Sequence, residues 1–144
     1  MRFMMIVKAN QRSEAGDMPD DKMIAAMTKY NEDLAKAGVL LDLLGLQRSA
    51  MGARIKFARD GKRTVVDGPF GKPEDLIAGY WLIQVKSRDE AIEWAKRAPA
   101  PHGEGNAAEI ELRRVFELED FADVAGSETM EQARKLEQKL AKKA

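Results

Sequence analysis

The sequence predicts an α+β fold: a ferredoxin-like protomer with an antiparallel sheet, an inserted hairpin and a C-terminal helix. Two observations predict it. Short apolar segments alternate with two segments of helical periodicity, and setting aside a hairpin signal in mid-chain leaves the order β-α-β, β-α-β. The chain has 144 residues, 44% of them hydrophobic, which suits one domain with a substantial core. We expect this domain to span residues 1–120 and a helical tail to span residues 121–144.

The first part of the chain predicts a strand, a helix and a second strand. Residues 2–9 form a short apolar run typical of a buried strand, and the polar residues 10–17 predict a loop. A helix is expected over residues 20–37, because apolar side chains recur at helical spacing and Gly38 follows as a stop. The apolar residues 39–46 predict the second strand. The helical apolar positions are Met23, Met27, Tyr30 and Leu34.

The middle of the chain predicts a hairpin followed by another strand. Residues 54–58 and 63–67 flank an Asp-Gly dipeptide, which is typical of a hairpin turn. Regular structure is expected to stop at residues 67–71, Asp-Gly-Pro-Phe-Gly, because glycine and proline interrupt helices and strands. The apolar residues 77–85 then predict a strand.

The last third of the chain predicts a helix, a strand and a separate tail helix. Ser87 and Glu90 have the spacing of a capping box, and Pro99 ends the helix that they open. Residues 108–116 predict the last main strand, and residues 127–143 predict a charged helix with a narrow apolar stripe. Such a stripe suits docking on a surface or a partner. Its members are Met130, Ala133, Leu136 and Leu140.

Composition excludes several classes of function. The 24 acidic and 24 basic side chains balance, which argues against a nucleic-acid partner and against a basic membrane-binding surface. The chain has no cysteine, which excludes disulfides, cysteine catalysis and thiolate metal sites and fits a cytoplasmic location. The apolar start of the chain is too short for a signal peptide or a membrane span. We expect no membrane association, no metal and no cofactor.

Residues 77–85 also predict a homodimer. Side chains alternate between the two faces of a strand, and both faces of this one are largely apolar. In a two-layer fold the helices cover only one face. A second copy stacked sheet to sheet would cover the other, and the alternative cover is the tail helix of the same chain. Burying each large apolar side chain is worth about 1.5–3 kcal/mol, so an uncovered face is unfavourable.

Asp67 and His102 are the candidates for catalytic residues. The rigid corner that begins at Asp67 would either aim this carboxylate into a cavity or form a turn in which Asp67 bonds backbone N–H groups and Phe70 fills the core. His102 suits acid–base chemistry because the ordinary pKa of histidine is about 6.5; the other interpretation is a solvated loop histidine. His102 and Glu104 together fall short of the roughly three protein ligands of catalytic zinc.

Six residues are predicted to bind a ligand. Glu109 and Glu111 share one face of the last strand and face either solvent or a polar cavity. Tyr80 and Trp81 point to opposite faces of their strand, and their rings suit pockets, interfaces and cores alike. A lysine that ends the first strand would pair with a carboxylate or an anionic ligand, or would serve solubility. The predicted ligand-binding residues are Lys8, Phe70, Tyr80, Trp81, Glu109 and Glu111.

Several of these segments resemble a known family in combination. Residues 66–70, Val-Asp-Gly-Pro-Phe, and residues 76–81, Leu-Ile-Ala-Gly-Tyr-Trp, look like the DGPF family, a branch of the YCII-related proteins. Residues 37–40, residues 90–95 and Pro99 support the resemblance, which covers about residues 1–118. The resemblance implies a dimeric α+β barrel of ferredoxin-like protomers.

The resemblance leaves two functions open. Some DGPF proteins are encoded near extracytoplasmic-function sigma factors, which implies a regulatory or interaction protein without catalysis. YCII-related proteins have been proposed as enzymes with a His–Asp pair, but the one histidine of this chain, His102, stands late and matches that pair poorly. The second possible function is to bind or transform a small molecule, as a homodimer, in a cleft between the sheet and the helices.

Overall fold

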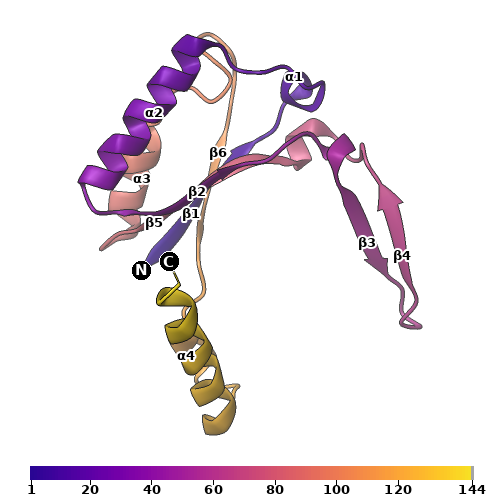
Figure 1. Cartoon of the computed structure of the whole chain (residues 1–144), viewed down its shortest axis with the longest axis vertical. Coiled ribbons are helices and arrows are strands. Elements are labelled where there is room, and N and C mark those ends of the chain that lie inside the picture. The colour runs from indigo at the N-terminus through magenta and orange to yellow at the C-terminus, as the bar shows by residue number, and fades with distance from the viewer. Residues whose placement is uncertain (144) are drawn as a thin grey trace.

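The computed structural model describes residues 1–143, and Ala144, the last residue of the predicted tail, lies outside the described residues. Its main helices and strands follow the predicted order (Figure 1). The elements are β1 (Arg2–Lys8), α1 (Gln11–Glu14), α2 (Asp21–Lys36), β2 (Leu40–Gly45), η1 (Ser49–Met51), β3 (Ala53–Phe57), β4 (Arg63–Asp67), η2 (Pro73–Asp75), β5 (Ile77–Gln84), α3 (Arg88–Lys96), β6 (Ile110–Arg114), η3 (Leu118–Phe121) and α4 (Ser127–Ala141).

Four strands form the main sheet in the order β2-β5-β1-β6, and every neighbouring pair is antiparallel. This order confirms the ferredoxin-like α+β prediction, in which the two βαβ halves interleave. The register places Met5 of β1 opposite Trp81 of β5 and Leu112 of β6. Because directly paired residues point to the same face, these three side chains share the face that the helices cover. Figure 1 shows α2 and α3 together on one side of the sheet.

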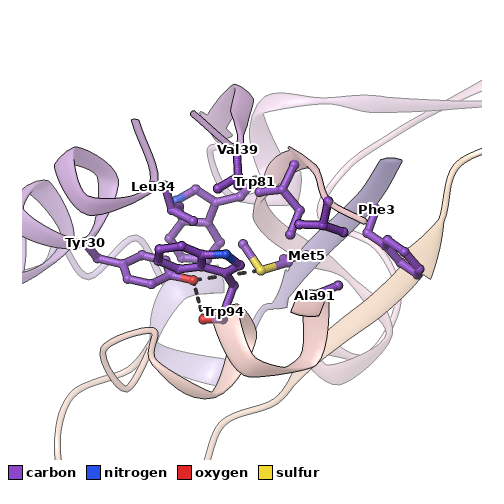
Figure 2. Packing of buried hydrophobic residues seen from close by; sticks show 10 residues of the cluster. Phe3, Met5, Tyr30, Leu34, Val39, Trp81, Ala91 and Trp94 are labelled. Carbon is purple, nitrogen blue, oxygen red and sulfur yellow. Dashed lines mark hydrogen bonds between the residues drawn. The ribbon is translucent and has the colours of Figure 1, made fainter. Parts of the chain in front are cut away.

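The core lies between this face and the two helices. Met5, Leu34 and Ile83 are fully buried there. Tyr30 of α2 meets Trp81 edge to face, with 5.3 Å between ring centroids and 86° between ring planes. Figure 2 shows the hydroxyl of Tyr30 pointing at the main-chain carbonyl oxygen of Trp94, to which it donates a hydrogen bond of 2.6 Å. Burial raises the pKa of Tyr30 to about 12.

The dense packing of this layer corrects the prediction of a ligand cleft between sheet and helices. The side chains that would border such a cleft, among them Trp81 and Trp94, are buried in one continuous cluster. Packed interiors leave few voids larger than a water molecule. A candidate site therefore has to lie on the other face of the sheet or at its ends.

Capping residues set the helix ends, with one departure from the prediction. Asp20 caps α2 by accepting a hydrogen bond of 2.8 Å from the N–H of Met23, so Pro19 lies just before the helix. Ser87 caps α3, as predicted, and accepts from the N–H of Glu90. The Glu90 carboxylate, however, accepts from the N–H of Lys86 and not from that of Ser87. The predicted capping box is thus shifted by one residue on its acidic side.

The short helix α1 was not predicted, because its segment has no apolar periodicity. A capping box holds it: Asn10 Oδ1 accepts from the N–H of Ser13 at 2.9 Å, and Ser13 Oγ accepts from the N–H of Asn10 at 3.0 Å. The helix brings Glu14, at its end, to the 3-10 turn η1.

Strands β3 and β4 form a separate two-stranded sheet, and none of their residues is buried. The hairpin turns at Gly61, whose φ of 87° favours glycine. Figure 1 shows it projecting from the sheet on the side away from α2 and α3. The tail helix α4 also has no buried residue; it packs beside η3 at one end of the sheet and does not lie across it (Figure 1). The prediction of a domain boundary at residue 120 stays a prediction.

Candidate functional site

The face of the sheet that the helices leave uncovered has an apolar centre. We call this surface the open face. Ile6 pairs with Tyr80, and Met4 pairs with Leu82, so all four side chains point away from the helix layer. Leu44 extends the surface onto β2 through its pairing with Tyr80. Ile6 is only 8% exposed at the middle of this surface, and the other side chains on β1 and β5 are half-buried.

Polar groups border the open face on both edges. On the β2 edge, the Tyr80 hydroxyl donates to Asp42 Oδ2 at 3.3 Å. Desolvation and the neighbouring Asp42 carboxylate raise the pKa of the Tyr80 phenol, which keeps it a hydrogen-bond donor at neutral pH. On the β6 edge, Glu111 pairs with Ile6 in the sheet and forms an ion pair of 3.4 Å with Arg113. The open face therefore combines an apolar floor with a donor and carboxylates at its margins.

His102 and Lys8 meet at the end of β1. His102 Nε2 lies 2.9 Å from the main-chain oxygen of Lys8. Because a carbonyl oxygen only accepts hydrogen bonds, Nε2 carries the hydrogen, and Nδ1 of the neutral ring keeps its lone pair. The loop is held by Asn106, whose amide donates to the carbonyl oxygen of His102 at 2.9 Å. Glu109 reaches the same place, since its carbonyl oxygen accepts from the N–H of Lys8 at 3.2 Å.

The Asp-Gly-Pro-Phe corner packs against η1. A Cβ atom on Gly68 would lie 1.8 Å from the carbonyl oxygen of Ser49, so only glycine fits at this position. The N–H of Phe70 donates to Ser49 Oγ at 3.2 Å, and the Ser49 hydroxyl and N–H both donate to the Glu14 carboxylate. The guanidinium of Arg54 lies 4.1 Å from the centre of the Phe70 ring. The corner thus ties the root of the hairpin to α1.

The predicted site residues lie at four places in the structure. Lys8, His102 and Glu109 come together at the end of β1, while Tyr80 and Glu111 flank Ile6 on the open face. Asp67 is exposed at the end of β4, and Phe70 is half-buried under Arg54. Trp81 is buried in the core, where its indole N–H donates to Asn31 Oδ1 at 2.7 Å.

Sequence reasoning missed several residues of these arrangements, among them Asp42, Glu14, Ser49 and Arg54. Asp42 had a signal, because it is the one charged residue in the apolar segment 39–46. Glu14, Ser49 and Arg54 had none, since their roles depend on contacts between segments far apart in the sequence. Within residues 1–143, no three His, Asp or Glu side chains are placed to hold a metal ion. A surface hollow of about 520 Å³ lies at the far end of the sheet, and Arg2 and Glu117 help to line it, but none of the predicted site residues does.

Comparison with known proteins identifies the family to which the chain belongs. A family model described as the YCII-related domain matches residues 1–119. The chain belongs to the YCII-related family. An uncharacterized protein of Rhizobium meliloti (strain 1021) is 26% identical to it over 77 residues, which are 54% of this chain and 61% of that protein. The match spans about three fifths of the length of this relative.

The match encloses every predicted site residue of this YCII-related domain and ends before α4. The expected DGPF branch fits the YCII-related family. The corner after which that branch is named, Asp67 to Phe70, serves in this structure as the joint between hairpin and body.

Proposed function

We propose that this YCII-related protein is a homodimer that binds a small molecule on the open face of its sheet. One observation carries the proposal: the central strands turn a nearly continuous apolar surface away from the core, bordered by Tyr80, Asp42 and Glu111. A sheet from a second copy would remove this surface from water, at about 25 cal/mol per Å² of apolar area buried. Space left between the two sheets would be apolar in the middle and polar at its edges, which is the usual make-up of a ligand pocket.

Tyr80 and Glu111 have distinct roles in this proposal. The phenol of Tyr80 donates to an oxygen or nitrogen of the bound molecule in place of Asp42, and the Glu111 carboxylate accepts from a ligand donor. Lys8 and His102 lie at the end of β1, where an ammonium group and a ring Nδ1 would contact a charged or exchangeable group. Asp67 and Trp81 take no part, because one is exposed beside the hairpin and the other is in the core.

Native mass spectrometry of the purified full chain tests this function. We expect the dimer to carry a copurified molecule, or to gain one from a metabolite library, and we expect Tyr80→Phe combined with Glu111→Gln to lose it. Lys96→Ala, an exposed residue of α3, is the matched control and should keep the molecule. Retention by the double variant with unchanged occupancy would contradict the proposed site.

A second function, that of a regulatory interaction protein, is favoured by the tail helix. Leu136 and Leu140 of α4 are exposed, and the stripe to which they belong is predicted to dock on a surface or a partner. The sigma-factor link implied by the family resemblance stays a prediction. Deleting residues 127–144 should abolish capture of a partner protein while leaving the dimer intact. If the truncated and full-length chains capture the same partners, the tail has no such role.

No helix within residues 1–143 is long and apolar enough to cross a membrane.

A further inference from the structure

The hairpin β3–β4 presents an apolar face that no other segment within residues 1–143 covers. Ile55 pairs with Val65, and Phe57 and Arg63 form the next pair on the same face. Phe57 is 67% exposed and Val65 is 69% exposed. An isolated two-stranded hairpin is marginally stable in water, and soluble proteins rarely leave several large apolar side chains exposed together. This hairpin therefore has the character of an arm that packs on another surface.

The hairpin is also strongly basic. Residues 54–63 contain five basic side chains and one acidic side chain, in a chain whose charges balance to zero overall. Arg54 is engaged with Phe70, and Arg63 lies over the Phe57 ring at 4.8 Å. Lys56, Arg59 and Lys62 remain exposed.

The segment after β6 has the complementary composition. Residues 116–128 contain five acidic side chains and no basic one. Several of its apolar side chains are also exposed, among them Phe116 at 70% and Val124 at 83%. Apolar side chains are thus interspersed with Glu119 and Asp123, and within residues 1–143 neither carboxylate forms an ion pair.

We infer that the hairpin of one copy docks on residues 116–124 of a second copy. Both surfaces expose apolar side chains, and their charges are opposite. Contact between them would bury the apolar side chains of both and bring basic groups of one beside acidic groups of the other. Figure 1 shows the hairpin and the end of the chain that holds α4 leaving the sheet in different directions, which separates the two surfaces within one chain. The hairpin also projects on the side of the sheet away from α2 and α3 (Figure 1), which is the side on which a stacked second copy would lie.

A two-fold symmetric dimer forms this contact twice, because each copy offers one hairpin and one acidic segment. The inference rests on the dimer proposed above and adds the arms that hold it and set its orientation. The corner at Gly68 and Ser49 fixes the direction in which the arm leaves the body.

A charge-swap experiment with the full chain tests the inference. Variant A carries Arg59→Glu and Lys62→Glu in the hairpin, and variant B carries Glu119→Lys and Asp123→Lys in the acidic segment. Each variant alone places like charges in both contacts, and we expect its dimer dissociation constant to rise about tenfold or more. Mixed together, A and B place opposite charges in both contacts, and we expect a heterodimer of about wild-type affinity.

The controls separate this inference from the dimer proposal. Circular dichroism and thermal melting verify that each variant is folded, and Lys29→Glu with Lys96→Glu changes charge equally on the helix side. A wild-type chain that is monomeric would overturn both the dimer and the arm. A wild-type dimer that A and B leave unchanged would overturn the arm alone. The arm proposal would also be overturned if variant A keeps its dimer affinity but loses binding to labelled single-stranded DNA. The basic arm would then be a nucleic-acid-binding surface.

Discussion

The phenol of Tyr30 donates a hydrogen bond of 2.6 Å to the main-chain oxygen of Trp94, and this bond joins α2 to the end of α3. Tyr30 is buried, so its hydroxyl has no water to replace this partner. The same ring packs edge to face on Trp81 of the sheet. One side chain therefore connects α2, the end of α3 and strand β5.

Replacing Tyr30 by phenylalanine should lower the free energy of unfolding by about 1–3 kcal/mol, because the Trp94 carbonyl oxygen loses a buried partner. Urea denaturation of the purified variant measures the change. Thr28→Ala is the control: it removes an exposed hydroxyl from the same helix and should shift stability by no more than about 0.5 kcal/mol. An equal loss in the free energy of unfolding for the two variants would show that the buried Tyr30 bond stabilises the fold no more than an exposed hydroxyl does.

Stability should depend on alkaline pH through the same residue. Burial raises the pKa of Tyr30 to about 12 in the folded chain, whereas an unfolded tyrosine titrates near about 10. The unfolded chain therefore loses this proton first, and the stability that neutral Tyr30 provides is complete below about pH 10 and lost as pH rises toward about 12. The wild type should lose stability relative to Tyr30→Phe across this window. A constant difference between the two proteins would contradict the raised pKa.

Gly68→Ala should disrupt the joint between hairpin and body. The added Cβ would lie 1.8 Å from the Ser49 carbonyl oxygen, so the backbone must shift, and we expect a loss of about 1–3 kcal/mol or more. Thermal melting measures this loss, and limited proteolysis should cut the hairpin faster. Gly126→Ala is the control, because nothing lies within 4 Å of its added methyl group. A Gly68 variant that melts and resists protease like the wild type would argue against a structural role for the corner.

Arg2 and Glu117 join the segment before α4 to the sheet. Arg2 Nε donates to Glu117 Oε1 at 3.1 Å and Nη2 donates to Oε2 at 3.0 Å, and this pairing holds the pKa of the Glu117 carboxyl below its usual range. A lowered pKa means that the stabilisation is present above the unfolded pKa, about 4.3, and is lost as pH falls through the folded value.

Glu117→Gln should therefore speed amide hydrogen exchange in residues 115–141 at neutral pH and leave the core unchanged. The global free energy should fall by no more than about 1 kcal/mol, since the pair is partly exposed. Exchange measured by mass spectrometry at about pH 4 and at about pH 7 checks the sign. No change at the higher pH would mean that the pair does not anchor the tail.

The strands and long helices were predictable because their apolar periodicity is local. Met23, Met27, Tyr30 and Leu34 mark α2 in the sequence alone, and β5 stands out as a short apolar run that begins at Ile77. Helix α1 was not predictable from periodicity, because a capping box of Asn10 and Ser13 forms it without any apolar residue.

The site was less predictable, because its contacts join distant segments. Trp81 and Tyr80 are neighbours in sequence, and the side of the sheet on which the helices pack decides that one is core and the other open. The Phe70–Ser49–Glu14 network depends on a close approach of two loops at Gly68. His102 was singled out as the only histidine, but its bond to Lys8 required the loop after α3 to return to β1.

Sedimentation equilibrium of the full chain tests the central claim, that a second copy covers the open face. We predict a mass twice the 16.1 kDa of one chain at micromolar concentration, and a shift toward the single-chain mass for Leu82→Glu on the open face. Leu140→Glu, on the exposed stripe of α4, should leave the dimer intact. A folded wild-type chain that stays at 16.1 kDa up to the highest concentration measured would contradict the claim.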